Sequence, residues 1–249
     1  MKAMIFAAGL GTRLRPLTDS IPKALVPVGD KPMLQHVLEH ISLVGIREVV
    51  VNVHHFPDMI RQFLSANGNF GLEISVSDER DCLLDTGGGL VKAIPLLGDS
   101  EPVLLHNADI LTDLPLPEMI EFHEKQMPDA TLLAWDRESS RRLLFDSRAA
   151  MKGWRNMATG EIRPSSLDPQ GLRPLAFGGI HVVSPSLFPS LEEYARRKGP
   201  VFSITPFYVE ACQTRDIRAF IPSEPFDWFD IGRPESLRKA SQFISDIYC

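Results

Sequence analysis

The feature that most constrains this chain is a glycine-rich turn that follows an apolar run at its N-terminus. Residues 1–8 contain a single lysine and are otherwise apolar, which predicts a buried strand. The run ends at Gly9 and Gly11, and glycine lets backbone amides approach a ligand closely. Arg13 and Lys23 follow in the same stretch. Arginine offers phosphate a planar fork and lysine a mobile charge, so the stretch predicts a polyphosphate site.

Two commoner phosphate motifs do not fit this stretch. The dinucleotide fingerprint requires a third glycine where this chain has Leu14, and an acid at the end of a second strand. Asp30 lies near the required distance, but it stands in a turn between a glycine and a Lys-Pro pair. The P-loop requires Gly-Lys-Ser/Thr at the start of a helix, whereas Lys23 lies between Pro22 and Ala24. The sequence therefore predicts a phosphate-binding loop of another class.

This stretch and four further blocks resemble the signature of the sugar-1-phosphate nucleotidylyltransferases, which make nucleotide sugars from an NTP and a sugar phosphate. The blocks are GLGTRLRPLT to PKALVPV at 9–28, DTGGG at 85–89, NAD at 107–109, FGGIH at 177–181 and WFDIG at 228–232. They stand in the family's order, so the resemblance covers nearly the whole chain. The triple glycine and the short length are most similar to the N-acetylmuramate-1-phosphate uridylyltransferases.

The reaction of this family joins a sugar 1-phosphate to the α-phosphorus of an NTP and releases pyrophosphate. A phosphate monoester is already largely dianionic near pH 7, because its second pKa is about 6. Catalysis therefore needs positioned cations more than it needs a general base. We expect Arg13 to clamp the β- and γ-phosphates, and Lys23 to bridge the α-phosphate and the attacking phosphate. Arg15 is either a surface residue or a second phosphate contact.

Mg²⁺ is the expected metal ion, because it prefers oxygen ligands and usually takes one or two carboxylates together with substrate phosphates. Asp109 follows an apolar strand, which places its carboxylate at a strand's carboxyl end, where open α/β sheets bind ligands. Asp230 lies in a second short apolar run. The resemblance implies that both aspartates bind one metal ion. Asp113 is expected in a turn.

Further contacts are expected around the phosphate loop and on the sugar side. The expected nucleotide-binding residues are Ala8, Gly9, Gly11, Thr12, Thr86, Gly87 and Gly88, and the expected sugar contacts are Asn107, Arg155, Glu161 and Gly179. The triple glycine should lie against the nucleoside, because a backbone without side chains permits that approach. Its alternative is a flexible loop before a helix, and Gly179 either backs the sugar or forms a strand bulge.

The chain departs from the family at two positions. Many relatives carry a Glu-Lys-Pro whose lysine grips the sugar phosphate, and this chain has none. Arg155 or Arg163 is expected to supply the missing charge, and Glu161 to accept sugar hydroxyls. Ala108 replaces the usual glycine before the metal aspartate, which adds a methyl group near the ribose or the base.

Strand and helix patterns alternate along most of the chain, which predicts an α/β fold with parallel strands. Strands are expected over 1–8, 47–53, 72–76, 103–107, 130–135, 175–183, 217–221 and 228–231, and helices over 32–44, 57–66, 90–97, 117–126, 185–197, 203–212 and 234–248. We expect one Rossmann-like, GT-A-type domain over residues 1–249, with three layers and a mixed, mostly parallel central sheet. Residues 137–174 are charged and turn-rich, and we expect an antiparallel excursion there that covers the sugar side.

Composition restricts the setting in which the chain works. The net charge of −6 argues against a nucleic-acid partner, so positive charge at the phosphate loop must be local. No apolar run is long enough to cross a membrane. The three cysteines have no metal-like spacing, and a reducing cytoplasm is the expected compartment. The oligomeric state, monomer or homodimer, stays open.

Three alternatives to a uridylyltransferase that uses UTP stay open. The first is a guanylyltransferase for mannose or heptose 1-phosphate, since the bases are distinguished by a few hydrogen bonds that the sequence does not place. A regulatory protein that binds nucleotide sugars without turnover tends to lose the metal aspartates or the loop lysine, and this chain keeps them. A glycosyltransferase of related fold would require an Asp-x-Asp pair, whereas residues 107–109 contain one acid.

Overall fold

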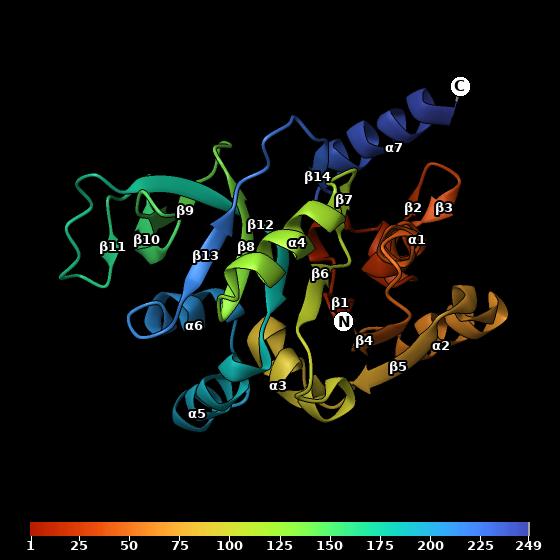
Figure 1. Cartoon of the computed structure of the whole chain (residues 1–249). Coiled ribbons are helices and arrows are strands. Elements are labelled where there is room, and N and C mark those ends of the chain that lie inside the picture. The colour runs from red at the N-terminus through yellow and green to blue at the C-terminus, as the bar shows by residue number, and fades with distance from the viewer. Residues whose placement is uncertain (249) are drawn as a thin grey trace.

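A sheet of ten strands runs through the computed structural model, which describes residues 1–248 (Figure 1). Four neighbouring strands are parallel: β6 (Val103–Asn107), β1 (Lys2–Phe6), β4 (Glu48–Val53) and β5 (Glu73–Asp78). On the other side of β6 lies β12 (Arg173–Val183), which runs antiparallel to β6 and to β8 (Ala130–Trp135). Strand β13 (Ile217–Phe220) pairs parallel with β8. The predicted α/β class with a mixed sheet is confirmed.

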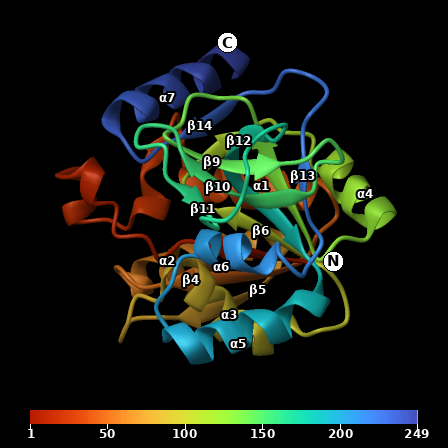
Figure 2. The same cartoon turned by 90° about the vertical axis from the view of Figure 1, so that its left-hand side faces the viewer.

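Alternating side chains of the strands pack against helices on both faces of the sheet. Ile5 of β1 belongs to a hydrophobic cluster with α1 (Met33–Leu43), α2 (Pro57–Ala66), α4 (Leu116–Gln126) and α7 (Pro234–Tyr248). Met4 belongs to a second cluster with α3 (Asp85–Leu97), α5 (Phe188–Lys198) and α6 (Ile204–Ala211). Because neighbouring residues of a strand point to opposite faces, these two clusters make three layers. Figure 2 shows α7 on one side and α3 and α5 on the other.

The predicted excursion contains three antiparallel strands at one end of the molecule, opposite α2 (Figure 1). They are β9 (Arg141–Phe145), β10 (Met151–Asn156) and β11 (Ile162–Arg163). Strand β9 joins the main sheet through the first residues of β12. That residues 1–249 form one domain stays a prediction.

Two small sheets position the loops at the carboxyl ends of the parallel strands. Strand β2 (Pro27–Val28) pairs with β3 (Lys31–Pro32), and β7 (Ile110–Thr112) pairs with β14 (Trp228–Asp230). The second pair brings the C-terminal third of the chain back to the end of β6. No helix of residues 1–248 combines the length and the apolar character that crossing a membrane requires.

The predicted start of the helix at the triple glycine was wrong. The helix expected to begin at Leu90 begins at Asp85, so all three glycines of the block at 87–89 lie inside α3. Glycine is unfavourable in a helix interior, and this is why the sequence pattern suggested a later start. The glycines are buried and close to other segments, and this packing overrides the local preference.

Candidate active site

The loop after β1 folds back on itself at Gly11. Gly11 has φ of 65°, and a Cβ atom there would lie 2.8 Å from Cγ2 of Thr18 and 3.0 Å from Cβ of Lys23. The hydroxyl of Thr18 donates to the carbonyl of Gly11 at 2.8 Å, and the amide of Leu14 donates to the same carbonyl at 2.8 Å. Only glycine fits this position, and the fold places Lys23 directly beside the loop.

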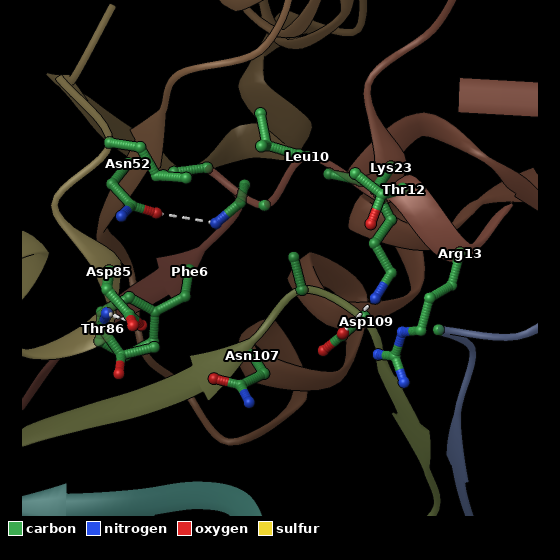
Figure 3. A pocket seen from close by; sticks show the side chains of 18 of the residues that line it. Phe6, Leu10, Thr12, Arg13, Lys23, Asn52, Asp85, Thr86, Asn107 and Asp109 are labelled. Carbon is green, nitrogen blue, oxygen red and sulfur yellow. Dashed lines mark hydrogen bonds and ion pairs between the residues drawn. The ribbon is translucent and has the colours of Figure 1, made fainter. Parts of the chain in front are cut away.

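A cavity of about 490 Å³ opens at the carboxyl ends of β1 and β6, between this loop and the start of α3 (Figure 3). We call it the first cavity. Its lining includes nine of the predicted site residues: Ala8, Gly9, Gly11, Thr12, Arg13, Lys23, Thr86, Asn107 and Asp109. The structure therefore brings the glycine loop, both predicted cations and one predicted metal ligand together in one cavity.

Lys23 and Asp109 form an ion pair between Nζ and Oδ2, and Figure 3 shows both side chains directed into the first cavity. The 3₁₀ helix Lys23–Leu25 carries the lysine, and the link between β6 and β7 carries the aspartate. Their side chains keep 11% and 27% of their exposure, so a ligand in the cavity can reach both. The contact joins a residue of the signature loop to one 86 positions away.

Asp230 lies beside Asp109 through the pairing of β7 and β14. The amide of Ile231 donates to the carbonyl of Asp109 at 3.0 Å, and Asp230 stands opposite Ile110. A Cβ atom on Gly232 would lie 2.5 Å from Nη2 of Arg13 and 2.8 Å from Oδ1 of Asp230. Gly232 and Arg13 line the first cavity, and Asp230 lies beside Gly232 without itself being one of the lining residues.

Asp109 and Asp230 could hold a metal ion. The described part of the chain has no group of three His, Cys, Asp or Glu side chains that could form a closed metal site. The pairing of β7 and β14 brings the backbones of the two aspartates together. Two carboxylates fit Mg²⁺, which takes few protein ligands and fills its other positions with water and substrate phosphate. Asp113 is not part of this pair, because its Oδ1 accepts from the amide of Asp227 at 2.7 Å. The residue lies in the irregular link between β7 and α4, and not in the predicted turn.

Arg15 lies outside the first cavity. Its guanidinium pairs with Asp19 at 3.1 Å, and 65% of its side chain is exposed. Of the two interpretations of Arg15, the structure favours a surface residue.

A buried polar network connects the loop after β1 to α3, and the sequence analysis missed it. Oδ1 of Asn52 accepts from the amide of Ala7 at 2.7 Å, and its Nδ2 donates to Oε1 of Glu79 at 2.7 Å. Oε2 of Glu79 accepts from the amide of Leu84 at 3.0 Å. A Cβ on Gly89 would lie 2.8 Å from this carboxylate, so the third glycine makes room for the network. An asparagine inside the apolar strand β4 was the available signal.

Gly87 and Gly88 do not line the first cavity, so the reason predicted for them was wrong. A Cβ on Gly87 would collide with the ring of Phe202, and one on Gly88 with the carbonyl of Pro200. Both amides donate to the carbonyl of Phe202, at 2.9 and 3.2 Å. The two glycines let α3 pack against residues 200–202 instead of approaching a nucleoside.

Of the four predicted sugar contacts, Asn107 lines the first cavity and the other three do not. Arg155 is on β10 and lines neither cavity described here, and its buried Nε has no hydrogen-bond partner. Glu161 lines a second cavity and pairs with Nε of Arg163 at 2.7 Å. Gly179 has φ of 76° and stands behind Asn107, since a Cβ there would lie 2.6 Å from Nδ2 of that side chain. The register of β12 shifts around Gly179, as a strand bulge requires.

Arg137 is a further residue that the sequence analysis did not identify. Its guanidinium lies 4.3 Å from the ring centre of Trp228, and its Nη2 donates to the carbonyl of Phe177 at 3.0 Å. Burial lowers the pKa of Arg137, and the nearby charge of Asp230 opposes that shift. The indole of Trp228 donates to the carbonyl of Gly178 at 2.9 Å. These contacts attach β14, which carries Asp230, to β12.

Comparison with known proteins decides the family. A family model described as nucleotidyl transferase matches residues 2–142, more than half of the 249 residues. N-acetylmuramate alpha-1-phosphate uridylyltransferase of Caulobacter vibrioides is 33% identical over 253 residues, which cover 98% of this chain and 97% of that protein. The chain belongs to the nucleotidyl transferase family.

The chain is also similar to a guanyltransferase and to two solved structures. Mannose-1-phosphate guanyltransferase of Aspergillus oryzae is 30% identical over 247 residues, which cover 94% of this chain and 62% of that protein. A putative glucose-1-phosphate thymidylyltransferase from Bacillus anthracis superposes with a TM-score of 0.81 at 20% identity, covering 99% of this chain and 96% of the other. An apo UDP-glucose pyrophosphorylase gives the same TM-score and identity over 100% of both chains. These structures confirm the predicted Rossmann-like fold.

Proposed function

We propose that this nucleotidyl transferase moves a uridylyl group from UTP to a sugar 1-phosphate and releases pyrophosphate. The observation that carries the proposal is the first cavity, where the glycine loop, Arg13 and Lys23 face Asp109. The near full-length relative from Caulobacter vibrioides supports UTP as donor and N-acetylmuramate 1-phosphate as acceptor. We place the reaction in the cytoplasm, where the free thiols of Cys82 and Cys212 stay reduced.

The phosphates of UTP bind the loop at residues 8–13. Backbone amides beside Gly9 and Gly11 approach the phosphates, because neither glycine presents a side chain to the cavity. Arg13 reaches the edge of the cavity and holds the β- and γ-phosphates that leave as pyrophosphate. Thr86, at the first turn of α3, lines the opposite side, where the nucleoside lies.

The chemical step is an in-line displacement at phosphorus. An oxygen of the sugar phosphate attacks the α-phosphorus, and a new P–O bond forms. The bond from the α-phosphorus to the bridging oxygen of the β-phosphate breaks, and its electron pair leaves with pyrophosphate. Lys23 lies beside Asp109, where it contacts both the α-phosphate and the attacking phosphate and reduces their repulsion. No proton has to move, because the attacking phosphate is a dianion.

Asp109 and Asp230 would hold Mg²⁺ in this reaction. When bound, the ion neutralises part of the charge that gathers on the α-phosphate. The chain's own contribution is to hold β14 close to Asp109. It does so through the hydrogen bond from Ile231 to Asp109 and the attachment of β14 by Arg137.

Pyrophosphate release with purified protein and Mg²⁺ tests the proposal. UTP, GTP, CTP and ATP are each combined with N-acetylmuramate, glucose, mannose and heptose 1-phosphates. We expect the highest kcat/KM with UTP and N-acetylmuramate 1-phosphate. Highest turnover with GTP would replace the proposal by a guanylyltransferase. Nucleotide binding by thermal shift without any release would replace it by a regulatory protein.

A further inference from the structure

A second cavity, of about 850 Å³, lies between the excursion and helices α5 and α6. One wall is the face of β9 and β10 that presents Arg141 and Trp154, and the other presents Tyr194 and Lys198 of α5. Phe177 of β12 also lines it. The volume falls within the range of small-molecule sites, which is about 300–1,000 Å³.

The second cavity shares two structural elements with the first. Val201 lines the first cavity, and Ser203, two residues further, lines the second. On β12, Phe177 lines the second cavity, and Gly179 stands directly behind Asn107 of the first. The linings of the two cavities are therefore neighbours along these two segments, although they share no residue.

The ion pairs around the second cavity leave an excess of positive charge. Both of its carboxylates already have a partner: Glu161 pairs with Arg163 at 2.7 Å, and Glu210 pairs with Arg197. Among the side chains that the structure describes, Arg141 and Lys198 have no ion pair and no side-chain hydrogen bond. Arg141 belongs to β9 and Lys198 to α5, so each of the two segments that line the cavity carries a cation available to an anionic ligand.

The aromatic side chains define the rest of the ligand. Trp154, Phe177 and Tyr194 add aromatic surface to the lining, against which the C–H groups of a sugar can pack. Arg163 and Arg197 lie over the rings of Trp154 and Tyr194, at 5.3 and 5.5 Å from the ring centres, so the edges of these two rings are what a ligand can reach. Burial raises the pKa of Tyr194, so its hydroxyl stays protonated and remains a hydrogen-bond donor. A cavity with aromatic surface and two cations available to an anionic ligand fits a sugar that carries a negative charge of its own.

We propose that the second cavity receives the sugar of the acceptor and that Arg141 and Lys198 select a sugar that bears a carboxylate. This proposal rests on the proposed function, and it adds the residues that distinguish an acidic sugar 1-phosphate from a neutral one. Guanidinium and ammonium groups form charge-assisted hydrogen bonds with a carboxylate, which a neutral sugar cannot replace.

The test compares two acceptors that differ by a single acidic group. N-acetylmuramate 1-phosphate carries a lactyl ether with a carboxylate, and N-acetylglucosamine 1-phosphate has a hydroxyl in its place. Calorimetry of each sugar phosphate with the full-length protein measures the preference without requiring turnover. We expect the acidic sugar to bind at least about tenfold more tightly, the effect of one charge-assisted hydrogen bond.

Arg141→Gln and Lys198→Gln should each lower the affinity for the acidic sugar about tenfold and leave that for the neutral sugar unchanged. Arg196→Gln is the matched control, because Arg196 lies on α5 outside the cavity and pairs with Glu193 at 3.1 Å. Equal binding of the two sugars, no binding of either, or variants that weaken both equally would overturn the proposal. Pyrophosphate release that is equal for both sugars would leave the proposed function intact, so the two failures are distinguishable.

Discussion

The two cavities differ in which of their charged side chains form ion pairs. In the first, the cation Lys23 is paired with the carboxylate of Asp109, and both point at the space where a ligand would lie. In the second, the carboxylates are paired with arginines, and the cations Arg141 and Lys198 form no ion pair with any side chain that the structure describes. A paired cation beside a carboxylate suits a metal–phosphate complex, which supplies both charges. Free cations suit a ligand that brings only negative charge.

The largest effect should come from the paired cation of the first cavity. We expect Lys23→Ala to lower kcat for pyrophosphate release by about a hundredfold to a thousandfold, because a donor to the transition-state charge is lost. Lys31→Ala is the control, since Lys31 also pairs with a carboxylate, Glu39, but lies outside both cavities. A Lys23→Ala enzyme with nearly normal kcat would remove the distinction between the two cavities.

Acid should lower the stability of the fold through two histidines buried in the central sheet. His106 of β6 and His181 of β12 are buried, and burial lowers the pKa of each to about 3. In the unfolded chain these two histidines become protonated below about pH 6.5, whereas in the folded chain they stay neutral until about pH 3. The free energy of unfolding should therefore fall by about 2 kcal/mol per histidine between pH 7 and pH 5.

Urea unfolding at the two pH values measures this loss. His181→Gln, which can keep a hydrogen bond to Tyr208, should remove the part of the loss that belongs to His181. An unfolding free energy that is the same at pH 7 and pH 5 would contradict the account.

Replacing a glycine by alanine should destabilise the fold where the glycine serves packing, and should leave stability nearly unchanged where the glycine faces the ligand. Gly88→Ala places a methyl group against the carbonyl of Pro200, and we expect it to destabilise the fold by about 1–3 kcal/mol. Gly9→Ala is the matched control, because no atom lies within 4 Å of the added Cβ, and it should change stability by less than about 0.5 kcal/mol. Thermal unfolding of both variants decides between packing and ligand contact.

The smallest effect should come from the excursion residue that lines neither cavity. Arg155→Gln should change kcat/KM by less than about twofold, the size expected for a residue away from the ligand. A tenfold loss would restore Arg155 as the replacement for the family's lysine. Steady-state kinetics at varied sugar phosphate concentration measure it.

The first cavity could be predicted from the sequence because its residues follow directly from strand ends. Gly11 and Asp109 come shortly after β1 and β6, and parallel neighbours end at the same edge of a sheet. The sequence alone could not predict what depends on distant packing. A glycine is needed at position 88 because the carbonyl of Pro200 packs against it, and the buried carboxylate of Glu79 accepts a hydrogen bond from Asn52. No local sequence pattern indicates either partner. Arg141 and Lys198 likewise meet across a cavity without sharing a motif.

The central claim is that Asp109 and Asp230 share one divalent cation at the first cavity. Electron paramagnetic resonance with Mn²⁺, which accepts the same oxygen ligands as Mg²⁺, measures this in the presence of UTP. The account predicts that Asp109→Asn and Asp230→Asn each weaken Mn²⁺ binding, whereas Asp113→Asn, which changes a carboxylate bonded to the amide of Asp227, leaves it unchanged. Unchanged Mn²⁺ affinity in Asp230→Asn would contradict the account.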